Sequence, residues 1–209
     1  MTLSKQNNNT VPIAHQSLSV QLALTGHSFL ITHTQTKEVL FFCETNFDQA
    51  TTPEDLLTHL TQKINETSAL KQNFDHVVLI HCNDMVTSVP KSLFDSQKAA
   101  EYLKFNSKIL ATDFIAFDQV HAQDIITVYA PYININNFFF DTYGEFSYYH
   151  ATTKLLDTIL NSPSEVAIPK VHVHVFKDSF TCIVSTDNKL QLCNTYSYKT
   201  PEDFIYYIL

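Results

Sequence analysis

The chain has 209 residues, which is enough to bury a substantial core as one or two domains. Its formal net charge is −8, and all 13 basic residues are lysine, so the cationic surface that nucleic-acid binding requires is missing. Only two glycines occur, which excludes the glycine-rich loops of Walker-type and dinucleotide sites. Because no apolar run approaches the roughly 20 residues of a membrane helix, we expect a cytoplasmic protein without a membrane partner.

Residues 1–14 contain an asparagine tract and no apolar core, so they predict a disordered tail rather than a signal peptide. The four cysteines lie within or beside apolar strand patterns and show no CxxC spacing. They are therefore expected to be buried free thiols rather than two disulfides.

Alternating apolar residues predict an antiparallel meander over residues 18–24, 27–33 and 38–44. A helix should follow, with Thr52 as its cap, Pro53 at its first position and Asp55 completing a capping box. The apolar run at 76–82 then favours a parallel strand buried on both faces.

The middle of the chain is expected to hold both helices and strands. Strands are predicted at 113–120, 124–130 and 144–149, and helices between 90 and 105 and at 132–143 and 150–161. The sequence NSPS at 161–164 is the best candidate for a boundary between two lobes.

Residues 171–209 repeat the pattern of residues 18–60. Strands are predicted at 171–176, 180–185 and 189–193, with a turn at Asp187-Asn188 and a helix from Thr200. The matching residues are Ser28-Phe29 with Ser179-Phe180, Cys43 with Cys193, Thr45 with Thr195, and Thr52-Pro53-Glu54-Asp55 with Thr200-Pro201-Glu202-Asp203. The chain stops inside this second helix, so the second copy has no fourth strand.

Three antiparallel strands, a crossover helix and a parallel strand resemble the ribonuclease-H-like unit, and two such units in tandem resemble the actin, hexokinase and Hsp70 superfamily. The chain is more narrowly similar to a Bacteroidetes family of unknown function (domain of unknown function 3822) with an actin-like ATPase fold. The similar stretches are LSVQLALTGHSF at 18–29, SVPKSLF at 88–94, VYAPY at 128–132, HATTKLL at 150–156 and KTPEDFIYYIL at 199–209.

The resemblance implies an α/β protein with a duplicated ribonuclease-H-like (actin-like ATPase) fold. Its mixed sheets would combine a β-meander with crossover helices. A first lobe with insertions is expected at 15–162 and a second, truncated lobe at 163–209. Members of that family are expected to continue past the position of Leu209 and complete the second lobe.

Active members of the superfamily place an aspartate and glycines on the first hairpin of each lobe, around the phosphates and magnesium. Here Leu24 stands where the first acid would be expected, and the second hairpin offers Asp178 without a glycine. We therefore predict no catalytic residue and no cofactor. The candidate contacts for a ligand between the lobes are Gly26, His27, Ser28, Lys177, Asp178 and Ser179.

His172 and His174 lie two apart on one predicted strand, so they share a face and could bind a transition metal. A third ligand such as His150 or His81 would be needed. In the alternative interpretation, Val171, Val173 and Val175 point to the core, and the two histidines point to the more solvent-exposed face of the sheet. The adjacent His81 and Cys82 point to opposite faces of their strand, so they cannot form a catalytic dyad.

Two aromatic groups predict either core packing or a protein interface. The first group comprises Phe138, Phe139, Phe140, Tyr143, Phe146, Tyr148 and Tyr149, and the second comprises Tyr196, Tyr198, Tyr206 and Tyr207. We expect at least one of them to be an interface. The sequence thus favours a non-catalytic binding or scaffolding protein that contacts a protein partner or itself. The alternative is a nucleotide-dependent, ATP-binding enzyme with atypical phosphate contacts.

Overall fold

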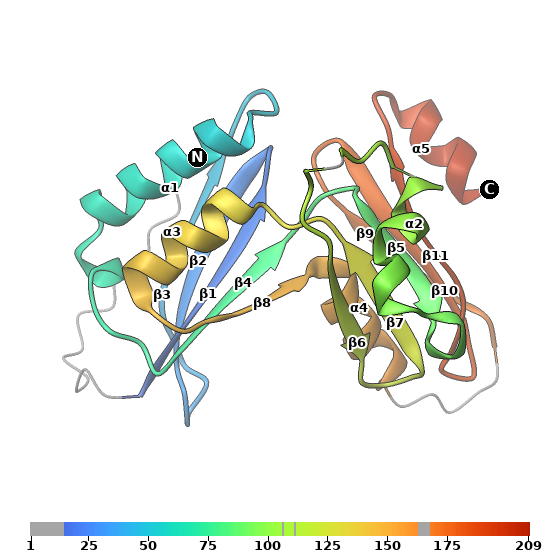
Figure 1. Ribbon diagram of the computed structural model, residues 1–209, viewed down its shortest axis with the longest axis horizontal. Helices are drawn as coiled ribbons and strands as arrows, with labels where there is room; N and C mark the ends of the chain where they lie inside the picture. Colours follow the sequence, from blue (N-terminus) through green and yellow to red (C-terminus); the bar gives the residue numbers. More distant parts are fainter. Residues whose placement is uncertain (1–14, 106, 111, 163–167) are drawn as a thin grey trace. The chain divides into compact units, whose positions relative to one another are not determined.

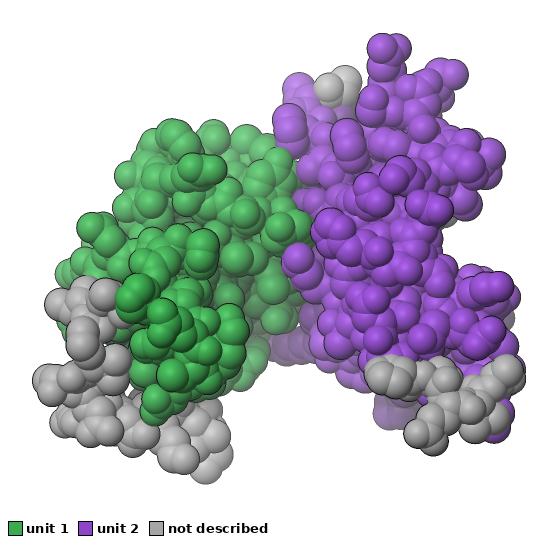
Figure 2. Space-filling model, turned by 90° about the horizontal axis from the view of Figure 1, so that it is seen from below, with its two compact units in different colours: residues 1–83, 131–149 green, residues 84–130, 150–209 purple. Residues whose placement is uncertain are grey.

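The computed structural model describes residues 15–105, 107–110, 112–162 and 168–209, and the tail expected at 1–14 lies outside them. Contacts divide the chain into two compact units, which Figure 2 shows in different colours. Unit 1 comprises residues 1–83 and 131–149, and unit 2 comprises residues 84–130 and 150–209. The expected boundary near residue 162 differs from this division. The chain leaves unit 1 after Asn83 and returns at Pro131, so each unit is built from two separate segments.

Unit 1 is built on a five-stranded mixed sheet (Figure 1). Its strands, in the order β3-β2-β1-β4-β8, are β3 (Val39–Asn46), β2 (Gly26–His33), β1 (Gln16–Ala23), β4 (His76–His81) and β8 (Ser147–His150). β1 pairs antiparallel with β2 and parallel with β4, as the sequence predicts. One face of β4 is buried and the other is only half-buried, because helices cover a single face of this sheet.

Helices α1 (Pro53–Glu66) and α3 (Ile133–Tyr143) lie side by side on that face (Figure 1). α1 begins where predicted, because the Thr52 hydroxyl accepts a hydrogen bond from the Asp55 amide and Pro53 occupies the first turn. A 3₁₀ turn, η1 (Ser68–Leu70), follows it. The buried core between sheet and helices comprises Leu18, Val20, Leu22, Phe29, Ile31, Leu56, Leu60, Val77, Leu79, Ile135 and Phe139 among others.

Unit 2 contains two three-stranded antiparallel sheets. The first has the order β5-β7-β6, with β5 (Val86–Pro90), β7 (Ile125–Tyr129) and β6 (Ala116–Val120). The second has the order β11-β10-β9, with β11 (Lys189–Ser197), β10 (Ser179–Thr186) and β9 (Lys170–Val175). The helical elements are η2 (Lys91–Leu93), η3 (Ser96–Lys98), α2 (Ala99–Lys104), α4 (Ala151–Leu160) and α5 (Pro201–Ile208). β5 was not predicted, since the sequence indicated a helical start around Pro90.

The two faces of the β9–β11 sheet are covered by different helices. Ile183 of β10 lies in a core with Leu156 and Leu160 of α4. Phe180, whose side chain alternates to the other face, contacts the ring of Phe204 of α5 at 4.6 Å. We call this second face the α5 side. Pairing across the strands places on the α5 side Val171, Val173 and Val175 of β9, Phe180, Cys182 and Val184 of β10, and Leu192, Asn194 and Tyr196 of β11.

The duplication expected from the sequence is present as a shared skeleton. β11-β10-β9 repeats the strand order of β3-β2-β1, and α5 follows β11 as α1 follows β3. Thr200 caps α5 through a complete capping box with Asp203, and Asp187-Asn188 forms the predicted turn with positive φ at both residues.

The residue-by-residue match between the copies is less regular than the sequence indicates. Phe29 faces Cys43 across β2 and β3, whereas Phe180 faces Tyr196 and Cys193 faces Ile183. Strand pairing therefore shows that the match of Phe29 with Phe180 and the match of Cys43 with Cys193 cannot both hold. The two hairpins keep their topology but not a common register.

All four cysteines are free, and Cys43, Cys82 and Cys182 are buried, which confirms the expectation of free thiols. Among the described residues, no helix has the length and apolar character needed to cross a membrane.

Candidate functional site

Gly26 opens β2 and is required by strand pairing. A Cβ atom at this position would overlap the main-chain carbonyl oxygen of Thr45 on β3, which only glycine avoids. Its presence in the first hairpin is therefore explained by the close approach of two strands. A phosphate-binding role needs a further observation beyond the glycine itself.

His27 follows Gly26 and points into the core of unit 1, where it is 4% exposed. Its ring meets Phe29 and Phe47 edge-on, and Nδ1 has no hydrogen-bond partner. Burial, reinforced by the charges of Lys63 and His59, lowers the pKa of His27 to about 4. The ring is thus neutral near pH 7 and adds no positive charge that would attract a phosphate. Ser28 points to the opposite face.

In the second hairpin, Lys177 and Asp178 lie in the turn between β9 and β10, and Ser179 is the first residue of β10. The Phe176 amide donates to the Ser179 carbonyl at 2.8 Å, and the Tyr198 amide donates to the Asp178 carbonyl at 3.0 Å. Asp178 is exposed at the turn. The six candidate ligand contacts thus belong to two hairpins, one in each unit.

His172 and His174 point to the same side of β9, opposite Ile183 and Thr181 of β10. In the part of the chain that the structure describes, no three His, Cys, Asp or Glu side chains come together as metal ligands. The two residues considered as third ligands are engaged elsewhere. His81 Nε2 lies 2.9 Å from the Asn136 amide oxygen, and His150 Nδ1 accepts from the Thr152 amide at the start of α4.

The interpretation that valines of β9 take the core face is wrong. Val171 is 58% exposed and Val175 is 53% exposed, although they share the α5 side with the buried Phe180. The physical reason is that the rings of the short helix α5 pack on Phe180 of β10 and Tyr196 of β11, where Tyr207 stacks on Tyr196 at 4.5 Å. They do not cover β9, because Val175 is paired with Phe180 and is still exposed. The β9 part of the α5 side therefore lacks a covering helix among the described elements.

His81 and Cys82 are both buried and point in opposite directions, as predicted. The Tyr132 amide donates to His81 Nδ1 at 3.4 Å, so the proton resides on Nε2 and is donated to Asn136. Burial lowers the pKa of His81 to about 4 and raises the pKa of Cys82 to about 12. A thiol with this pKa is protonated at neutral pH and is a poor nucleophile.

Asp118 is a half-buried carboxyl group that sequence reasoning missed. It lies on β6 and accepts hydrogen bonds from the Tyr129 hydroxyl at 3.0 Å, the Thr153 hydroxyl at 2.8 Å and the His150 amide at 3.1 Å. Burial raises the pKa of Asp118, although these donors oppose the shift. The bonds attach the start of α4 to β6, which is a structural role. The only sequence signal is an acid inside the predicted strand at 113–120.

A small cavity lies in unit 2 beside the start of α4. It has a volume of about 20 Å³ and is lined by Ser88, Thr152, Cys193 and Thr195 among others. This is room for about one water molecule and too little for a nucleotide. Burial raises the pKa of the Cys193 thiol to about 11, so this cysteine is also unreactive.

An open depression of about 570 Å³ lies in unit 1 over the loop from β3 to α1, lined by residues 46–52 with Asp55 and His59. A helix N-terminus can bind phosphate through free amides, but here the Thr52 hydroxyl already accepts from the Asp55 amide. Asp48 and Asp55 line the depression and Glu54 lies in the first turn of α1, so acidic residues surround it. Electrostatics therefore disfavour a polyphosphate at this position.

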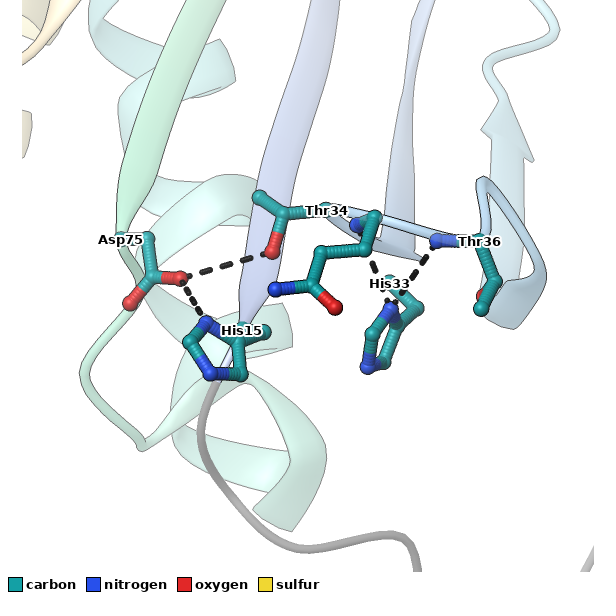
Figure 3. Close-up of polar contacts among 6 residues, drawn as sticks. His15, His33, Thr34, Thr36 and Asp75 are labelled. Carbon is teal, nitrogen blue, oxygen red and sulfur yellow. Dashed lines mark hydrogen bonds and ion pairs between the residues drawn. The ribbon is translucent and has the colours of Figure 1, made fainter.

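A cluster of polar side chains lies at the other end of the unit 1 sheet, near the start of β1 and the end of β2 (Figure 3). His15 Nδ1 lies 3.6 Å from an Asp75 carboxylate oxygen, to which the Thr34 hydroxyl also donates at 3.5 Å. His33 instead accepts from the amides of Gln35 and Thr36 with its Nδ1. His15 and Asp75 are 56% and 45% exposed, so this surface contact contributes little to stability.

The two aromatic groups differ in how far they are buried. In the first group Phe139 is fully buried and Tyr143 donates to the Leu70 carbonyl, so most of it is the core of unit 1, with Phe140 exposed. In the second group Tyr206 is 78% exposed and Tyr207 44% exposed. One group of exposed aromatic and aliphatic side chains in unit 2 therefore lies on α5 and on β9–β11. They are Val171, Val175, Leu192, Ile205, Tyr206, Tyr207 and Ile208. Unit 2 also exposes apolar side chains outside these elements, namely Leu93, Phe105, Leu110, Phe114, Phe117, Ile168 and Leu209.

Comparison with solved structures identifies the fold. A Bacteroides thetaiotaomicron protein with actin-like ATPase fold and unknown function matches with a TM-score of 0.86 at 19% identity, over 96% of this chain and 78% of that chain. The PilM-PilN type IV pilus biogenesis complex matches with a TM-score of 0.51 at 10% identity, over 90% of this chain and 63% of that chain. The chain therefore has the actin-like ATPase fold, as expected from its resemblance.

Among proteins with curated descriptions, none matches this sequence. A model of the family described as "Protein of unknown function (DUF3822)" matches residues 5–209, which is nearly the whole chain. The expected family is thereby confirmed, and the chain belongs to the DUF3822 family.

Proposed function

We propose that this chain is a non-catalytic protein-binding or scaffolding module on an actin-like fold, and that it binds through unit 2. The observation that carries the proposal is the exposure of apolar side chains on β9–β11 and α5. Val171 of β9 and Ile205 and Tyr206 of α5 are each more than half exposed. Exposed apolar surface of this kind favours a protein partner.

The chemistry of the remaining sites supports a binding role over catalysis. His27 is neutral and buried, Cys82 and Cys193 are unreactive thiols, and Asp118 is held by three donors. The fold neighbour PilM is named in a complex with PilN, which shows that one protein with this fold assembles with another protein.

The alternative is a nucleotide-dependent enzyme with atypical phosphate contacts. Its candidate residues are Gly26, His27, Ser28, Lys177, Asp178 and Ser179, of which only Lys177 carries a positive charge at neutral pH. Isothermal titration of the full chain with ATP and Mg²⁺ separates the two functions. We expect no saturable heat. Tight binding that is lost in Asp178→Ala would overturn the scaffold in favour of the enzyme.

A photo-crosslinking pair tests the binding role itself. A benzophenone amino acid is placed at Tyr206 in unit 2 or at the matched exposed aromatic Phe140 in unit 1. We expect one defined protein adduct, a partner or a second copy, from position 206 and none from position 140. Equal patterns from both positions would indicate nonspecific contact and would contradict a binding role for unit 2.

A further inference from the structure

The small cavity beside α4 lies where three distant segments of unit 2 meet. Its lining comes from β5, from the first turn of α4 and from β11, and comprises Val86, Thr87, Ser88, Thr152, Cys193, Asn194 and Thr195. Cys193 belongs to the core around Leu156 of α4 and Ile183, so the cavity lies on the α4 face of the β9–β11 sheet, opposite the α5 side. Its volume of about 20 Å³ exceeds the roughly 10–15 Å³ that one water molecule needs.

Hydroxyl side chains converge on this cavity from all three segments. Ser88 of β5, Thr152 of α4 and Thr195 of β11 each line it. Ser88 is paired with Thr127 of β7, so their two side chains point to the same face of that sheet. Thr127 is 0% exposed, and its Oγ1 has no hydrogen-bond partner among the described residues. A buried hydroxyl group in this position is stabilised by a water molecule that sits beside Ser88.

The chemistry of the lining is polar but uncharged. None of the seven lining residues is an Asp, Glu, Lys or His. Burial raises the pKa of Cys193 to about 11, so its thiol is neutral near pH 7. A metal cation in the cavity would therefore have no carboxylate to balance its charge. The Thr195 hydroxyl shares one hydrogen bond with the Thr181 hydroxyl at 3.0 Å, which leaves it able to make another.

We infer that this cavity is a binding site for one water molecule, which hydrogen-bonds to hydroxyl groups of β5, α4 and β11. Buried water typically makes about three such bonds. Apolar contacts of Val120 with Leu156 and Ile183 already hold the segment 84–130 against the rest of unit 2. Because apolar contacts are not directional, the water adds the polar bonds that fix β5 in one position on α4 and β11. The inference is independent of the proposed binding role.

A crystal structure of the full chain, at a resolution that shows ordered water, tests the site directly. We expect one density peak at about 2.6–3.2 Å from at least two of the hydroxyl oxygens of Ser88, Thr127, Thr152 and Thr195. A cavity without such a peak, or hydroxyl groups that bond only to one another, overturns the inference. A peak with five or six short oxygen contacts identifies a metal cation and also overturns it.

Two matched variants in α4 test what the water does. Thr152→Val keeps the shape of the side chain and removes the hydroxyl that lines the cavity. Thr158→Val makes the same change where the hydroxyl donates to the Lys154 carbonyl within the helix. We expect hydrogen exchange at residues 86–89 of β5 to become about five-fold faster in Thr152→Val and to change less than two-fold in Thr158→Val.

Thr152→Ser separates the hydroxyl from the side-chain methyl group. It retains the hydroxyl, so β5 should exchange within two-fold of the natural chain. Equal acceleration by Thr152→Val and Thr158→Val, or equal acceleration by Thr152→Val and Thr152→Ser, contradicts a water-mediated bond at this position. The crystallographic test needs no variant, so it decides the inference even if Thr152→Val does not fold.

Discussion

The two meanders of this protein share a skeleton but differ in how completely one face is covered. In unit 1 the face carrying Leu18 and Phe29 packs against α1 and α3, and β4 extends the sheet beside β1. In unit 2 the rings of the eight-residue α5 contact Phe180 of β10 on the α5 side, whereas Val171 and Val175 of β9 on the same side are more than half exposed. The comparison indicates that the exposed apolar surface of unit 2 reflects a difference in its cover, because the strand sequences themselves are equally apolar.

The largest expected difference is between equivalent helix positions. Leu60 and Ile208 each lie eight residues after a capping threonine, and they are 0% and 38% exposed. Leu60→Ala should lower the free energy of unfolding by about 2–5 kcal/mol, because it leaves a cavity in a closed core. Ile208→Ala should change it by about 0.5 kcal/mol or less. Urea unfolding followed by circular dichroism measures both, and equal losses would show that α5 is as firmly packed as α1.

Lowering the pH should reduce the stability of unit 1 before that of unit 2. His27 and His81 are buried in unit 1, and burial lowers the pKa of each to about 4. A folded-state pKa below the unfolded value of 6.5 gives stability that is fully present above pH 6.5 and is lost as pH falls toward 4. The loss is on the order of 3 kcal/mol for each histidine. In unit 2 the raised pKa of Asp118 acts in the opposite direction, since the folded state then binds the proton more tightly.

Hydrogen exchange at pH 7 and pH 5, corrected for intrinsic rates, measures this difference for each unit. His27→Leu is the matched variant, because His27 has an unpartnered Nδ1 whereas His81 has two partners. We expect His27→Leu to reduce the acid sensitivity of unit 1. Earlier loosening of unit 2 would contradict the assignment of acid sensitivity to these histidines.

A smaller effect distinguishes the two hairpins that contain the candidate ligand residues. Gly26→Ala forces a Cβ against the Thr45 carbonyl and should destabilise the protein by about 1–3 kcal/mol. Asp178→Ala, in the exposed turn of the second hairpin, should change stability by less than about 0.5 kcal/mol. Thermal unfolding of both variants tests this, and a tolerated alanine at position 26 would reopen a ligand-binding explanation for the glycine.

Local sequence signals predicted much of this fold. The alternation in β1, the capping threonines at 52 and 200 and the Asp187-Asn188 turn depend on neighbouring residues, and each appears in the structure. β5 was missed because Pro90 resembles a helix start, whereas its strand state depends on pairing with β7 far along the chain. The exposure of Val171 was mispredicted for a similar reason, since alternation identifies a strand's apolar face but not whether anything covers it.

The candidate site was less accessible to sequence reasoning. The types of residue on the two hairpins could be read from the chain, including the missing acid at Leu24. The structural reason for Gly26 could not, because it depends on the position of Thr45 on another strand. The donors around Asp118 come from β7 and α4, so its burial also required the fold.

The discontinuity of unit 1 has a consequence for how the protein is made. Its core requires Ile135 and Phe139 of α3, which are synthesised only after the whole segment from Asp84 to Ala130. When the first 130 residues have been synthesised, α3 is still missing, and the hydrophobic face of the unit 1 sheet is uncovered where α3 will pack. Unit 1 can reach its native packing only when the chain has returned from unit 2, so co-translational folding of the two units is interleaved rather than sequential.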